Sequence, residues 1–147
     1  MKIALIGNTP RAERIGRVLT GSGHELATGI PYDQVTASDA IVMAVPWDKV
    51  DKTVVQMGPV GDKVVIDAVD APSDDDKSGA ERLALKLNSP HVVEAFAEDA
   101  EPGDAIRVCA DDPEAKAVVM DLIRSCGYEA EDAGPLANAA KLEHNAA

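Results

Sequence analysis

A short loop near the start of the chain combines residue types that can bind phosphate. A dinucleotide requires three things of such a loop: a tight glycine turn, close approach of the backbone to the pyrophosphate, and a small residue where helix meets strand. Gly7 and Ala12 meet the first and third requirements. Thr9 places a branched Cβ at the second, and Pro10 has no N–H to donate. The loop reads Gly7-Asn8-Thr9-Pro10-Arg11-Ala12.

Two interpretations of this loop stay open. Thr9 and Pro10 are also a well-formed helix start, with Thr9 as N-cap and Pro10 at the first helical position. Arg11 and Arg14 can bind an anion through their side chains, or they can face solvent as ordinary helix residues. The loop therefore predicts either an altered phosphate site or a helix terminus alone.

Further candidates follow later strands, because ligands of open α/β sheets bind beyond the carboxyl ends of strands where strand order reverses. Trp47 either lines such a pocket or covers the apolar end of its own helix. Asp67 and Asp70 either form an acid/base pair or act as turn carboxylates. No catalytic residue is assigned. The expected cofactor contacts are Gly7, Asn8, Thr9, Arg11, Ala12, Val45, Pro46, Trp47 and Ala68, and the expected substrate pocket is Asp70, Phe96 and Ala97.

The elements that must position these residues alternate between two apolar periods. Helices are expected to begin at Pro10, at Asp48 as a cap, at Ser78 as a cap, and at Asp112-Pro113, the last with Val118 facing inward. The link over 29–38 leaves room for about one helical turn. Strands are expected over 3–6, 25–28, 39–44, 63–67, 91–96, 105–109 and 128–131.

Strands that alternate with helices pair in parallel through right-handed crossovers. The sequence therefore predicts an α/β fold: a doubly wound, mostly parallel sheet of the Rossmann-like, NAD(P)-binding kind. We expect one domain over residues 1–140 and a frayed tail over 141–147.

Composition limits the classes of function. The chain has 147 residues and a formal net charge of -12, which disfavours nucleic acid and membrane surfaces as partners. Cys109 and Cys126 are expected to be free thiols, and three histidines show no metal-ligand spacing. The first apolar run is too short for a signal peptide. We expect a cytoplasmic protein without metal that binds a small molecule and can form a homodimer.

Six segments resemble one known family in order along the chain. They are Met1 to Gly7, Ser22-Gly23-His24-Glu25, Ala44-Val45-Pro46-Trp47, Gly79 to Ala84, Asp111 to Lys116, and Asp132-Ala133-Gly134-Pro135-Leu136-Ala137-Asn138. This set resembles the coenzyme F-420-dependent NADP oxidoreductases. The resemblance implies a Rossmann-type fold, NADP as cofactor, and hydride transfer with a deazaflavin, which depends on placing two rings more than on an acid or a base.

The chain departs from that family at the cofactor. Ile30-Pro31 replaces the Ser-Arg pair that would hold the 2′-phosphate of NADP, and Asp70 and Ala97 replace asparagines. The chain also ends soon after Asn138, where members of the family continue with further helices. Two hypotheses follow: an NADP-dependent oxidoreductase with an altered cofactor site, or a non-redox Rossmann-like protein that has lost dinucleotide binding. The second would be a lyase- or isomerase-type enzyme or a non-catalytic binding module.

Overall fold

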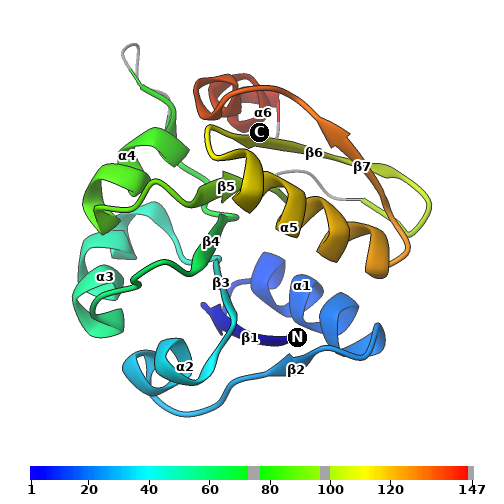
Figure 1. Cartoon of the computed structure of the whole chain (residues 1–147). Helices are drawn as coiled ribbons and strands as arrows, with labels where there is room; N and C mark the ends of the chain where they lie inside the picture. The colour runs from blue at the N-terminus through cyan, green and yellow to red at the C-terminus, as the bar shows by residue number, and fades with distance from the viewer. Residues whose placement is uncertain (73–76, 97–99, 146–147) are drawn as a thin grey trace.

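The computed structural model describes residues 1–72, 77–96 and 100–145, and of residues 143–145 it describes the backbone. Within these ranges seven strands form one sheet in the order β2-β1-β3-β4-β5-β6-β7 (Figure 1). The predicted mostly parallel, doubly wound sheet is confirmed. The strands are β1 (Lys2–Ile6), β2 (Glu25–Leu26), β3 (Ala40–Met43), β4 (Val64–Asp67), β5 (Val92–Glu94), β6 (Ala105–Ala110) and β7 (Glu129–Asp132).

One pair of strands departs from the expected parallel pattern. β5 and β6 run antiparallel, with Val93 opposite Ala110 and Glu94 opposite Cys109. The described residues between these strands contain no helix. Without a crossover helix the chain turns back beside β5 instead of crossing the sheet to start a parallel strand.

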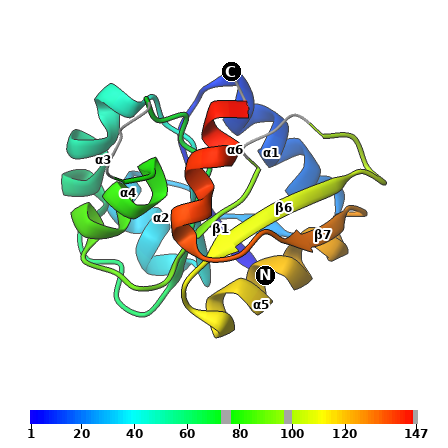
Figure 2. The same ribbon diagram turned by 90° about the horizontal axis from the view of Figure 1, so that it is seen from above.

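Helices cover both faces of the sheet (Figures 1 and 2). α1 and α5 lie on one face, and the remaining helices lie on the other. Over the described ranges, no helix has the length and apolar character needed to cross a bilayer. The helices are α1 (Pro10–Gly21), α2 (Pro31–Ala37), α3 (Val50–Met57), α4 (Gly79–Leu87), α5 (Pro113–Ser125) and α6 (Ala139–Asn145), with 3-10 turns η1 (Trp47–Lys49) and η2 (Leu136–Asn138).

Three of the four expected helix starts are confirmed. Thr9 caps α1, Asp112 caps α5, and Ser78 caps α4 in a reciprocal capping box with Glu81. The expected cap at Asp48 is wrong. Asp48 lies inside η1, and α3 follows it without a side-chain cap.

Alternate side chains of the central strands are buried in two separate half-cores, as expected for strands covered on both faces. Two expectations at the periphery change. Val118 is exposed, because the inward stripe of α5 is formed by residues such as Val119 and Leu122. Residues 141–145 of the stretch expected to be a frayed tail belong to α6, and Leu142 packs into the half-core on this face of the sheet.

Candidate functional site

The tips of β1, β3 and β4 lie side by side. Ile6 pairs with Met43, and Met43 pairs with Asp67, all in parallel register. Their following loops therefore emerge at one edge of the sheet. Strand order reverses here, because the chain passes from β2 to β3 across β1. This is the edge at which ligands of doubly wound sheets bind, and the expected grouping of these loops is confirmed.

Gly7 brings the first two of these loops into contact. Its backbone has φ +138°, and a Cβ at this position would lie 2.3 Å from the carbonyl oxygen of Ala44. Thr9 strengthens the same contact, since its Oγ1 donates to the Ala44 carbonyl at 2.9 Å and accepts from the N–H of Ala12 at 3.2 Å. The hydroxyl of Thr9 thus serves both the helix start and the loop contact.

In doubly wound sheets the ligand crevice lies between such loops, and the Arg11 side chain joins the loops after β1 and β4. Its Nη1 donates to the carbonyl oxygen of Ala68, at the tip of β4, at 3.1 Å. The guanidinium is half-buried and links the first turn of α1 to the loop after β4. Arg11 is therefore partly exposed and bonded to the protein, and its role as an anion ligand stays a prediction. The bond places a permanently charged group beside the tip of β4.

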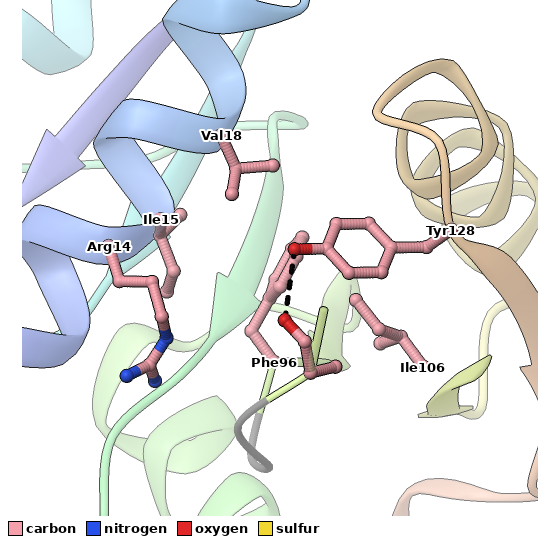
Figure 3. Close-up of a pocket in the computed structure, with 7 residues that line it drawn as sticks. Arg14, Ile15, Val18, Phe96, Ile106 and Tyr128 are labelled. Atoms are coloured by element: carbon pink, nitrogen blue, oxygen red, sulfur yellow. Dashed lines mark hydrogen bonds between the residues drawn. The ribbon is translucent and has the colours of Figure 1, made fainter. Parts of the chain in front are cut away.

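Arg14, one turn further along α1, belongs to a neighbouring cavity (Figure 3). The cavity holds about 10 Å³, which is room for a single water molecule. Phe96, whose backbone has φ +61°, lines this cavity. The Tyr128 hydroxyl donates to the Ala100 carbonyl at 3.2 Å. Burial raises the pKa of Tyr128. The lining consists of Arg14, Ile15, Val18, Phe96, Ala100, Ile106 and Tyr128.

The expected substrate-pocket residues have different environments. Phe96 is buried against this small cavity, whereas Asp70 is exposed in the loop after β4. Ala97 lies outside the described residues. The grouping of the three as a substrate pocket stays a prediction.

Two carboxylates are buried beside each other at the strand tips. Asp67 on β4 and Glu94 on β5 are register partners and are 1% and 0% exposed. Asp67 Oδ1 accepts from the Val69 N–H at 2.8 Å, as a turn carboxylate does. The sequence did not single out Glu94, although a glutamate between apolar residues of a predicted buried strand was a usable signal. Within the described part, no group of three His, Cys, Asp or Glu side chains is arranged to hold a metal.

Trp47 packs against α4. The guanidinium carbon of Arg82 lies 4.5 Å from the ring centroid, and Lys86 Nζ lies 5.7 Å from it. Such distances allow cation–π attraction. Of the other expected contacts in this loop, Val45 is buried and Pro46 is exposed.

A wider hollow opens from the first loop along α1 toward β2. Its volume is about 440 Å³, within the range of small-molecule sites. It starts at Gly7 and Asn8, so the predicted phosphate loop forms one end of it. The lining consists of Leu5, Gly7, Asn8, Ala12, Glu13, Gly16, Arg17, Thr20 and Leu26.

This edge fits a dinucleotide phosphate only if a side chain replaces the backbone N–H groups as the main phosphate contact. Gly7 makes the tight turn, and Ala12 is small and buried where α1 meets the sheet. Thr9 places a branched Cβ where the backbone would approach a pyrophosphate, and Pro10 has no N–H to donate. The Arg11 guanidinium lies among the same loops, and a guanidinium can bind phosphate.

Comparison with known proteins gives the same fold. No protein-family model matches the chain. A hypothetical protein from Sinorhizobium meliloti is similar in structure, with a TM-score of 0.79, 19% identity, and coverage of 95% of this chain and 86% of that one. A candidate F420-dependent NADP reductase from Arthrobacter gives a TM-score of 0.76, 17% identity, and coverage of 98% and 89%.

A reductive aminase from Aspergillus terreus, in complex with NADPH and ethyl levulinate, gives a TM-score of 0.71 and 16% identity. That match covers 99% of this chain and 58% of the aminase. At such identities the likeness concerns architecture and leaves activity to be argued from the site. The chain has a Rossmann-like fold.

Proposed function

We propose that this chain binds NADP(H) at the tips of β1, β3 and β4 and acts as an NADP-dependent oxidoreductase. The observation that carries the proposal is the Arg11 guanidinium, half-buried in the crevice of a chain whose net charge is -12. The strand order places this crevice where dinucleotides bind in doubly wound sheets. The NADPH complex of the Aspergillus aminase and the printed name of the Arthrobacter protein support the choice of cofactor.

Each of three residues has a separate role in binding the cofactor. Gly7 allows the tight turn, and Ala12 allows α1 to approach the sheet closely. When the cofactor binds, the Arg11 guanidinium gives up its hydrogen bond to the Ala68 carbonyl and bonds a phosphate oxygen instead. Its positive charge then offsets the negative charge of the phosphate. The cofactor would supply the hydride, and the chain's task is to hold and orient it. A deazaflavin as second substrate rests on the family resemblance and on the name of the Arthrobacter protein.

Titration with NADPH and with NADH tests the proposal, with thermal unfolding and Trp47 fluorescence as readouts. A ligand at one hundred times its Kd stabilises the fold by about 2.7 kcal/mol. We expect NADPH to raise the melting temperature. Arg11→Ala should weaken binding about tenfold or more, because a charge-assisted hydrogen bond is lost. No stabilisation by millimolar NADPH or NADH would refute the proposal.

A matched control separates the anchor from general electrostatics. Arg124 lies on the outer face of α5 and pairs with Asp121 at 3.2 Å. Arg124→Ala removes the same charge from the chain but leaves the crevice intact. Its affinity for NADPH should equal that of the unchanged protein. Equal weakening by both variants would show that Arg11 acts only through net charge.

One observation favours a second candidate, a non-redox protein that binds a smaller anion in the same crevice. The bonds from Thr9 to Ala44 and from Arg11 to Ala68 tie the three loops together across the path of a pyrophosphate. A nucleoside monophosphate would need to displace only the Arg11 bond. Stabilisation by such a monophosphate without stabilisation by NADPH would favour this candidate.

A further inference from the structure

Large exposed apolar side chains concentrate on one layer of helices. In the described part of the chain, six large apolar side chains are exposed. Four of them belong to the layer of α2, α3 and α4, and the other two are Met1 and Val118. The four are Ile30, Tyr32, Val55 and Leu85, at 64%, 54%, 82% and 67% exposure. We call this surface the α2–α4 face.

The helices that carry or follow these side chains are neighbours. α2 packs beside α3, and α3 packs beside α4, on the same side of the sheet (Figure 1). Val55 lies opposite the buried stripe of α3, and Leu85 lies opposite the buried stripe of α4, so both point away from the sheet. At the junction of α2 and α3, the Tyr32 ring lies next to Gly58.

The charge of this layer differs from that of the whole chain. Residues 30–37, 46–58 and 77–90, which contain α2, α3 and α4, carry five Lys or Arg and four Asp or Glu. The whole chain carries 14 basic and 26 acidic residues. Lys86 Nζ also bonds Asp51 Oδ1 at 2.6 Å and joins the two helices. This layer therefore offers an apolar surface with mixed charges on an otherwise acidic molecule.

The charge balance identifies the occupant. A two-fold contact places each surface patch against its own copy, so a strongly acidic patch would repel itself. Opposite charges on one patch allow cross-pairing between two copies, as Asp51 and Lys86 do here within one copy. We propose that the α2–α4 face is the interface of a homodimer, in which Val55 and Leu85 pack against the second copy and Asp51 and Lys86 lie on the same two helices. This inference does not depend on which ligand the crevice binds.

Sedimentation velocity from micromolar to millimolar protein tests the interface. The unchanged chain should sediment as a dimer at the upper concentrations. The variant Val55→Glu with Leu85→Glu should raise the dimer dissociation constant at least about tenfold, because two charges per chain would be buried against their own copies. Both side chains point into solvent in the single chain, so circular dichroism should show an unchanged fold.

Val118→Glu is the matched control. Val118 is exposed on α5, on the other face of the sheet. This variant adds one negative charge per chain, against two in the double variant, and should dimerise like the unchanged chain. A monomer at all concentrations would overturn the proposal and leave the face to a different partner. A dimer that survives the double substitution, or that Val118→Glu disrupts equally, would overturn it as well.

Discussion

At the scale of single residues, the contact between the loops after β1 and β3 depends on the absence of one side chain. Gly7 has a φ that other residues rarely adopt, and the Ala44 carbonyl occupies the place of a Cβ. The Thr9 hydroxyl then bonds that same carbonyl. A substitution at Gly7 would therefore push apart the two loops that form the proposed phosphate site.

Gly7→Ala should lower the free energy of unfolding by about 3 kcal/mol or more, since it combines a strained backbone with a steric clash. Urea denaturation measures this change. Gly21→Ala is the control, because nothing lies within 4 Å of a Cβ at Gly21. It should leave stability unchanged or raise it by up to about 1 kcal/mol. Similar losses in both variants would contradict the role of Gly7.

Residue types were easier to predict than residue directions. The sequence identified Arg11 as a candidate anion ligand but left open whether its side chain faces solvent. That direction depends on the Ala68 carbonyl, which lies 57 positions away and reaches Arg11 only through the pairing of β1, β3 and β4. Glu94 differs, because its burial could be predicted from its apolar neighbours in the chain, whereas its place opposite Asp67 and Cys109 depends on other strands.

At the scale of elements, the starts of helices could be predicted where the capping side chain bonds a backbone N–H close to it in sequence. Thr9, Ser78 and Asp112 each cap a helix within three residues of their own position. The predicted cap at Asp48 failed, because the residues after β3 first form the tighter turn η1. Trp47 in that turn packs against Arg82 of α4, a contact that local sequence does not encode.

The cap of α5 gives a pH-dependent contribution to stability. The hydrogen bond from His91, whose Nδ1 lies 2.6 Å from Asp112 Oδ2, holds the pKa of Asp112 below its ordinary value of 3.8. A lowered pKa in the folded state means that this contribution is present above the unfolded pKa. It is lost as the pH falls through the folded value.

Asp112→Asn should therefore make the free energy of unfolding fall less steeply as the pH drops below about 4. Asparagine can still cap the helix. Urea denaturation across acid pH measures the slope. Asp121→Asn, on the exposed face of α5, is the control for the loss of one carboxylate and should change the slope less than Asp112→Asn does. Identical slopes for the Asp112 variant and the unchanged chain would contradict the assigned bond.

At the scale of the whole molecule, the alternation of strands and helices predicted the sheet and the edge where the site lies. The antiparallel β6 was missed although a signal existed. Only residues 95–104 separate β5 from β6, and a parallel crossover needs about a dozen residues or more, usually with a helix. The exposure of Val55 and Leu85 also needed the structure, because a helical pattern with apolar residues on several sides does not show which of them face the core.

The central claim is that a nicotinamide dinucleotide binds across the tips of β1, β3 and β4. Amide chemical shifts recorded during NADPH titration test this claim most directly, because each loop reports separately. We predict that the largest shifts occur at Gly7, Asn8, Arg11, Val45 and Ala68, with small shifts in α5 and β7. Shifts concentrated on other elements, or none at millimolar NADPH, would contradict the account.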